Sequence, residues 1–90
     1  MRFTFDPRKR AANLRKHGLD LADAQMVLES GANVTFEDRR FDYGEERFLT
    51  IGPLRNQLVT IATSETANEI RVISARKATT NEKTIYRENS

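Results

Sequence analysis

The spacing of the apolar residues changes at Gly31, and this change limits the possible folds more than any other feature of the sequence. Before Gly31, apolar residues such as Leu21, Ala24 and Val27 recur at helical intervals. After Gly31, the chain consists of short segments rich in Val, Ile and Thr, separated by turns, which is typical of strands. Helices followed by neighbouring strands predict an α+β domain with a mostly antiparallel sheet.

Two helices are expected in the first part of the chain. The first begins with Asp6 as N-cap and Pro7 in the first helical position, and Gly18 ends it in the left-handed conformation. The second begins at Asp20 and continues to the change of period. Because the connection between them is so short, the two helices should lie against each other as a hairpin.

The second part of the chain predicts a sheet and a final helix. Strands are expected over residues 3–5, 33–36, 47–52, 57–63 and 69–75. The spacing from Thr79 to Glu82 is that of a capping box, which predicts a short helix at the C-terminus. We therefore expect one domain over residues 1–90, in which the helical hairpin packs on a sheet of four to five strands.

The composition argues against several classes of site. The chain has 90 residues, no cysteine and one histidine, so disulfides, thiolate metal sites and a conventional zinc site are not expected. No apolar run resembles a signal peptide or reaches the length of a membrane span. We expect a cytoplasmic protein without a metal, a cofactor or a membrane contact.

The charges are distributed unevenly along the chain, although the net charge is only +2. Residues 1–18 and 47–90 are rich in Lys and Arg, whereas residues 19–46 are rich in Asp and Glu. Basic ends around an acidic middle predict one surface that faces a polyanion and another of opposite character.

The segment Ile70–Lys77 delivers two arginines to one end of an apolar strand. A buried arginine requires a cleft or an acidic partner, because an unpaired buried charge is costly. Strict alternation places Arg71 and Arg76 on opposite faces, so both can serve one site only if the strand twists or bulges near Ser74. The acidic partners expected for them are Glu45, Glu46 and Glu69.

Three further positions carry groups that can act in chemistry. Glu46 and Arg47 stand where a loop enters a strand, and can form a general base and a phosphate clamp or a solvated edge. His17 forms a cationic corner with Lys16, and serves either in proton transfer or in helix capping. Tyr86 in the final helix is either a packing aromatic or a participant in the site.

The chain has no glycine-rich phosphate loop, no Ser/His/Asp order and no carboxylates at metal-binding spacing. An enzyme built on this sequence has to work with arginines, a histidine and a tyrosine. Metal-independent cleavage of RNA needs only such groups, because the 2′-hydroxyl of the RNA is itself the nucleophile. The first alternative is a module that binds nucleic acid or protein without catalysis. The second is a degenerate enzyme that has lost its activity and only binds a partner.

Three stretches of the chain resemble the BrnT toxins of prokaryotic type II toxin–antitoxin pairs. These are FDPRKRAANLRKHGLDLADA (5–24), GEERFLTIG (44–52) and IRVISARKATTNEKTIY (70–86). The resemblance implies a RelE-like fold and a ribonuclease that halts translation. It also implies neutralisation by a BrnA-type antitoxin, which is a ribbon-helix-helix-like DNA-binding protein. The toxin would contact operator DNA only through this antitoxin. The complex is also expected to contain a toxin dimer.

The resemblance implies a cationic active site whose catalytic residues are His17, Glu46, Arg47, Arg71, Arg76 and Tyr86. The three arginines would bind the scissile phosphate, His17 or Glu46 would move protons, and Tyr86 would assist. Lys16 and Lys77 would hold the RNA backbone.

Overall fold

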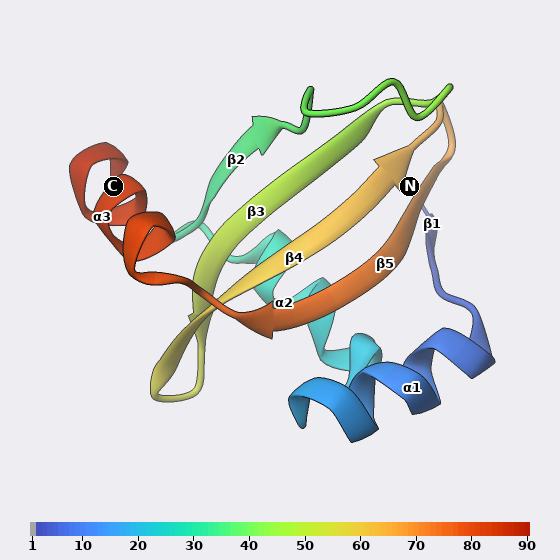
Figure 1. Cartoon of the computed structure of the whole chain (residues 1–90), viewed down its shortest axis with the longest axis horizontal. Coiled ribbons are helices and arrows are strands. Elements are labelled where there is room, and N and C mark those ends of the chain that lie inside the picture. The colour runs from blue at the N-terminus through green and yellow to red at the C-terminus, as the bar shows by residue number, and fades with distance from the viewer. Residues whose placement is uncertain (1) are drawn as a thin grey trace.

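The computed structural model describes residues 2–90 of the chain. Its elements, drawn in Figure 1, are β1 (Arg2–Thr4), α1 (Pro7–His17), a 3-10 turn η1 (Leu21–Asp23), α2 (Ala24–Glu29), β2 (Val34–Glu37), β3 (Arg47–Leu54), β4 (Gln57–Glu65), β5 (Glu69–Lys77) and α3 (Thr80–Asn89). The predicted helix caps are present, because Asp6 accepts a hydrogen bond from the backbone of Arg8, and Gly18 has φ 70°. The predicted capping box between Thr79 and Glu82 is also present at the start of α3.

The five strands form one sheet in the order β1-β5-β4-β3-β2. β1 runs parallel to β5, and the other neighbouring strands are antiparallel. These observations confirm the prediction of an α+β domain with a mostly antiparallel sheet and a short C-terminal helix. Within residues 2–90, no helix is both long enough and apolar enough to cross a membrane.

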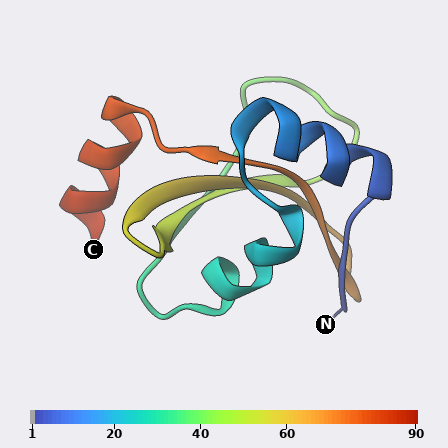
Figure 2. The same ribbon diagram turned by 90° about the horizontal axis from the view of Figure 1, so that it is seen from below.

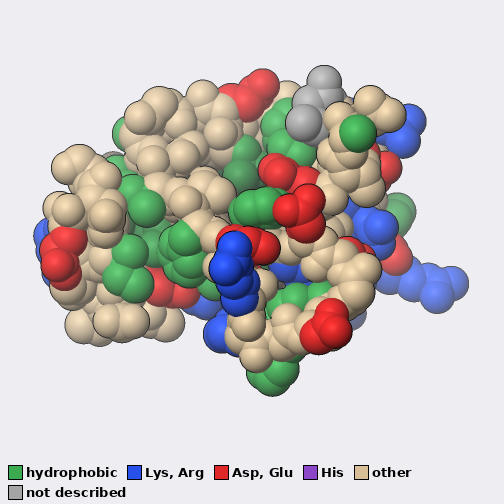
Figure 3. Space-filling view, turned by 90° about the horizontal axis from the view of Figure 1, so that it is seen from above, with side chains coloured by type: hydrophobic (Ala, Val, Ile, Leu, Met, Phe, Trp, Pro, Cys, Tyr) green, Lys and Arg blue, Asp and Glu red, His purple; other side chains and the backbone are tan. Residues whose placement is uncertain are grey.

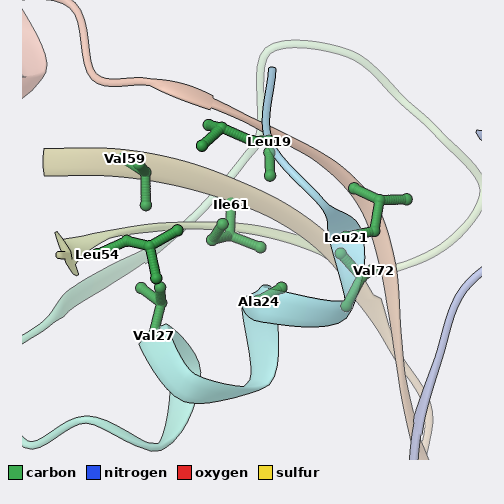
Figure 4. Close-up of a cluster of buried hydrophobic side chains, with 9 residues drawn as sticks. Leu19, Leu21, Ala24, Val27, Leu54, Val59, Ile61 and Val72 are labelled. Atoms are coloured by element: carbon green, nitrogen blue, oxygen red, sulfur yellow. The ribbon is translucent and has the colours of Figure 1, made fainter. Parts of the chain in front are cut away.

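The hydrophobic core lies between the sheet and the segment that contains η1 and α2 (Figures 2 and 4). Its buried residues come from both layers and are Leu19, Leu21, Ala24, Val27, Leu54, Val59, Ile61, Val72 and Ala75. At Gly52 on β3, a Cβ atom would stand 2.9 Å from Cγ1 of Val27, so glycine allows α2 to pack closely on the sheet. The face that α2 covers is called the core face below, and the opposite face, which carries α3 at one end, is called the second face.

Helix α1 lies along the edge of β5 and is held there by one buried side chain. Strand β1 pairs with β5 only at its start, which leaves the backbone groups of Ala75 without a strand partner on that side. The Asn13 amide replaces that partner, because it accepts from the N–H of Ala75 at 3.1 Å and donates to its carbonyl at 2.8 Å. Backbone groups of a strand point along the sheet plane, so α1 continues the sheet edge rather than covering a face.

Replacing Asn13 by alanine is expected to lower the free energy of unfolding by about 2 kcal/mol. The substitution leaves the backbone groups of Ala75 and the carbonyl of Leu19 without their present partner in a buried position. Urea denaturation followed by circular dichroism measures the change. The exposed turn residue Asn68 offers a matched control, whose alanine variant should stay within about 0.5 kcal/mol of the wild type.

Strands β3 and β5 run two residues beyond their predicted ends, to Leu54 and Lys77. The strand predicted over residues 47–52 ends just before Pro53, and proline cannot donate to a sheet ladder. In the structure β2 pairs with β3 only as far as Ile51, so one side of β3 is an open edge at Pro53. The missing N–H of Pro53 therefore removes no hydrogen bond between these strands.

Candidate functional site

A bulge in β5 decides which of its side chains share a face. The pairing with β4 shifts by one residue beside Ile73, which has no direct partner on that strand. The extra residue reverses the alternation, so Arg71 and Arg76 both belong to the second face. This is the bulge near Ser74 that the sequence required for the two arginines to serve one site.

Arginines from two strands stand in one row on the second face. Arg47 on β3 and Arg71 on β5 are both direct partners of Ser64 on β4. Neighbouring strands lie about 4.8 Å apart, so the two arginine backbones are about 10 Å apart. Arg71 is exposed, and the expectation of a buried arginine at this position is therefore wrong.

Arg76 pairs with Glu82 on α3, which was not among the three expected glutamates. Nη1 and Nη2 of Arg76 donate to Oε1 and Oε2 of Glu82 at 2.7 and 2.9 Å. Oε1 of Glu82 also accepts from the Thr60 hydroxyl and the Thr79 backbone N–H, each at 2.9 Å. The Glu82 residue is only 8% exposed, so one buried carboxylate fastens β4, β5 and α3 together.

These contacts shift the pKa of both partners. Burial raises the pKa of Glu82, but the hydrogen bonds from Arg76, Thr79 and Thr60 outweigh burial and lower the pKa to about 2. The hydrogen bond to Glu82 raises the pKa of Arg76, against burial and the positive charge of Arg40. At neutral pH the pair is therefore fully ionised, and the guanidinium is held in a fixed orientation.

The fork with Glu82 uses one hydrogen on each terminal nitrogen of Arg76. Among residues 2–90, the Nε–H of Arg76 has no hydrogen-bond partner, and the side chain is 30% exposed. A guanidinium offers five donors in a planar arrangement, so the edge with Nε–H and the second Nη2–H can still bind an anion.

Two adjoining hollows lie where α1 meets β5, with volumes of about 200 and 430 Å³. Both are lined by Lys16 and His17, and together they are called the α1–β5 groove. The first extends to Lys9 and Ser74, and the second is completed by Arg76, Lys77 and Thr79. Within the part of the chain that the structure describes, no carboxylate lines either hollow. The groove therefore concentrates positive charge where an anionic ligand meets little repulsion.

The loop between β2 and β3 adds a second set of charged groups. The carboxylate of Asp38 is 6% exposed and accepts from Nε and Nη2 of Arg40, each at 2.9 Å, and from the hydroxyl of Tyr43 at 3.1 Å. The hydrogen bond from Arg40 is the main cause that holds the pKa of Asp38 well below its usual range. The guanidinium of Arg47 lies over the Tyr43 ring, 4.0 Å from its centre. Figure 3, seen from above, shows Lys and Arg side chains close to Asp and Glu side chains.

A protein-family model described as "Ribonuclease toxin, BrnT, of type II toxin-antitoxin system" matches residues 5–82. The chain belongs to the BrnT toxin family. It is thus a ribonuclease toxin of a type II toxin–antitoxin system, with RNA as substrate and an antitoxin as partner. No curated protein sequence matches the chain.

The structure of this BrnT family member brings half of the predicted site residues together. Lys16, His17, Arg76 and Lys77 line one hollow of the α1–β5 groove, although 59 residues separate the histidine from Arg76 in sequence. Arg47 and Arg71 stand on the same face of the sheet as Arg76, but beyond the bulge, and neither lines the groove.

Glu46 and Tyr86 lie apart from the groove. Glu46 directly precedes β3 and is exposed, and alternation directs its side chain to the face opposite Arg47. The hydroxyl of Tyr86 donates to the carbonyl of Ala32 at 2.8 Å, just before β2. Since β2 and β5 are separated by β3 and β4, Tyr86 fastens α3 on the side of the sheet away from α1.

Several residues of the site were missed in the sequence, chiefly Glu82, Asp38, Arg40 and Lys9. The sequence assigned Glu82 only to the capping box, which uses one of its two carboxylate oxygens. It did not predict that both oxygens also accept hydrogen bonds from Arg76. The spacing Asp38-x-Arg40 was the available signal for the ion pair in the loop. Lys9 belongs to a basic run that fits either a solvated helix face or phosphate contacts, and only the position of α1 along β5 brings it to the groove.

Proposed function

We propose that this toxin cleaves RNA without a metal ion, by attack of a 2′-hydroxyl on the neighbouring phosphate. In that reaction a bond forms between the 2′-oxygen and phosphorus, and the bond to the 5′-oxygen breaks. The 2′-hydroxyl loses a proton, the 5′-oxygen gains one, and the products carry a 2′,3′-cyclic phosphate and a 5′-hydroxyl. Cleavage of cellular RNA in this way would stop translation.

The observation that carries this proposal is the meeting of His17 and Arg76 in a hollow without carboxylates. We assign the exposed edge of Arg76 to the scissile phosphate, where it would stabilise the charge of the pentavalent transition state. Lys16 and Lys77 would hold the flanking backbone as point charges.

His17 would transfer protons at the cleaved phosphate. Of the two groups assigned to this role, His17 lines the groove, whereas Glu46 precedes β3 on another part of the sheet. Arg47 and Arg71 would guide the RNA across the second face, because their charges stand in one row beside the bulge. Tyr86 would contribute through the position of α3 rather than through contact with RNA.

The partner of this toxin would be a BrnA-type antitoxin of the ribbon-helix-helix class. We propose that it neutralises the toxin within a complex that contains a toxin dimer, and that the toxin reaches operator DNA only through it. Co-expression of the antitoxin should restore growth, and size-exclusion chromatography with light scattering gives the stoichiometry of the complex.

Induction of the chain in bacteria tests the proposed activity. Growth should stop and cellular RNA should be fragmented, with cyclic phosphate ends. Purified protein should cleave RNA equally well in EDTA. Fragments with 3′-hydroxyl and 5′-phosphate ends, formed only with a divalent metal, would contradict the proposed mechanism. Normal growth with intact RNA would contradict the toxin assignment itself.

Replacing His17 by alanine is expected to lower the rate of RNA cleavage about 100-fold or more, the usual contribution of a proton-transferring side chain. Single-turnover cleavage of a short RNA measures the effect, with circular dichroism to establish that the variant is folded. His17→Gln keeps a hydrogen-bonding amide but cannot transfer a proton, so it should be equally slow. A glutamine variant with wild-type rate would show that the imidazole acts only as a hydrogen-bond partner.

A further inference from the structure

A third hollow lies at the end of the α1–β5 groove. It has a volume of about 340 Å³ and is lined by Asn56, Gln57, Leu58, Lys77 and Lys83. Lys77 lines this hollow as well as the groove, so the two hollows adjoin at that side chain. The chain path also connects them, because the N–H of Ala78, just after β5, donates to the carbonyl of Leu58 at 3.0 Å.

Together the three hollows form a track along β5. From Ser74 to Ala78 the chain advances four residues, or about 13 Å in an extended strand. A stacked nucleic-acid strand rises about 3.4 Å per nucleotide, so the track is several nucleotides long. Five basic residues follow one another along it, Lys9, Lys16, Arg76, Lys77 and Lys83. Among residues 2–90, no carboxylate lines any of the three hollows.

The amide side chains of the third hollow are available for a ligand. Asn56 and Gln57 both line the hollow and are exposed, so a ligand can reach their side chains. An amide carries both donors and an acceptor, which allows it to bind the edge of a nucleobase in a bidentate manner. Lysine, in contrast, has only donors and contacts phosphate without regard to sequence.

A tight turn holds these amides in place. Arg55 and Asn56 connect β3 to β4, whose end residues Leu54 and Gln57 are direct partners. Arg55 has φ 56°, a conformation that usually requires glycine in a two-residue hairpin turn. The paired residues Leu54 and Gln57 fix both ends of this two-residue turn, which limits the positions that Asn56 can take.

We propose that the third hollow is a nucleotide subsite for the RNA substrate, next to the scissile phosphate. Asn56 and Gln57 bind the edge of an unpaired nucleobase and Lys83 binds its phosphate. This inference rests on the proposed function, because the track leads out of the groove that contains His17 and Arg76. The subsite gives the ribonuclease a base preference at one position flanking the cleaved bond.

Cleavage of a pool of short RNAs with randomised positions, read by sequencing of the product ends, tests the subsite. The wild type should prefer one or two bases at a single flanking position. Gln57→Leu and Asn56→Ala should reduce that preference roughly tenfold, the discrimination that a bidentate contact provides. The matched control Asn68→Ala, a turn asparagine beside β5 at the other end of the sheet, should keep the preference.

The phosphate contact has its own signature. Lys83→Ala should slow cleavage of all sequences to a similar degree and reduce the slope of log affinity against log salt by about 0.7. Arg87→Ala on the same helix removes an exposed charge that lines none of the three hollows, and should leave the slope unchanged.

Three results would overturn the subsite. In the first, the variants at 56, 57 and 83 match their controls while Arg76→Ala is inactive, which leaves the proposed function intact. In the second, these variants weaken only the complex with the antitoxin, which makes the hollow a protein contact. In the third, the wild type cleaves no RNA, and both proposals fail together.

Discussion

Replacing Arg76 by alanine is expected to slow RNA cleavage by about 10²–10³-fold, the usual effect of removing one preorganised donor to a transition-state charge. The reason is geometric, because Glu82 holds the guanidinium through Nη1 and Nη2 and does not use its Nε–H, while Arg76 lines the groove. Single-turnover cleavage of a short RNA measures the effect, with circular dichroism to establish that the variant is folded.

Arg10→Ala is a matched control for this experiment. Arg10 also forms a bidentate pair, through Nε and Nη2 with the carboxylate of Asp20 at 2.7 and 2.9 Å, but it lines no part of the groove. Its loss should leave cleavage unchanged and have little effect on stability, because solvent screens an exposed ion pair. If folded Arg76→Ala cleaves RNA as fast as the control, Arg76 has only a structural role. A gradual decline over many basic positions would instead indicate a binding module without catalysis.

Replacing Glu82 by alanine is expected to lower the free energy of unfolding by about 3 kcal/mol, because removal of one partner leaves the other charge of a largely buried pair uncompensated. The Thr60 hydroxyl and the Thr79 backbone N–H lose their acceptor at the same time. In a domain of this size the change corresponds to a melting temperature lower by roughly 15 °C. The control Glu88→Ala, on the exposed side of the same helix, should have little effect.

The dependence on pH separates the charge of Glu82 from its packing. The usual glutamate pKa of 4.5 is lowered to about 2 in the folded chain, so the unfolded chain binds more protons between these values. The contribution of Glu82 is therefore complete above about pH 4.5 and is lost as the pH falls toward 2. Glu82→Gln should flatten this part of the stability curve, measured by urea denaturation at several pH values. An unchanged curve would show that other carboxylates cause the loss of stability in acid.

The rate of RNA cleavage by the Glu82→Ala variant tests whether the carboxylate positions Arg76. At a temperature where the variant is fully folded, the rate should fall, and Glu82→Gln should recover part of it. In the double variant with Arg76→Ala, loss of Glu82 should have no further effect on the rate, since its influence passes through Arg76. If loss of Glu82 lowers the cleavage rate by the same factor with and without Arg76, the two residues act independently.

The local signals in the sequence were reliable where neighbouring residues decide the structure. Asp6 and Gly18 delimit α1, and Thr79 starts α3, because capping depends on residues within one helical turn. The strand ends were less predictable. Whether Pro53 interrupts β3 depends on how far β2 runs beside it, and that length is a property of the sheet.

The site was predictable in its residue types but not in its geometry. Basic residues, one histidine and no metal-binding pattern already indicated phosphate chemistry. The identity of the partner of Arg76 was inaccessible, because Glu82 carried a sufficient local explanation as a capping residue. Glu46 and Tyr86 were grouped with the site by resemblance, and the fold places them away from the groove.

By itself, the sequence determined the α+β class, the helix caps and the cationic character of the site, since these follow from periodicity, short-range hydrogen bonds and composition. Only the tertiary structure decided that Arg71 and Arg76 share a face, because one unpaired residue, Ile73, reverses the alternation of β5. It also decided that His17 meets Arg76, because the buried amide of Asn13 fastens α1 to the open edge of β5. Both outcomes depend on hydrogen bonds between segments far apart in the chain, which no local pattern specifies.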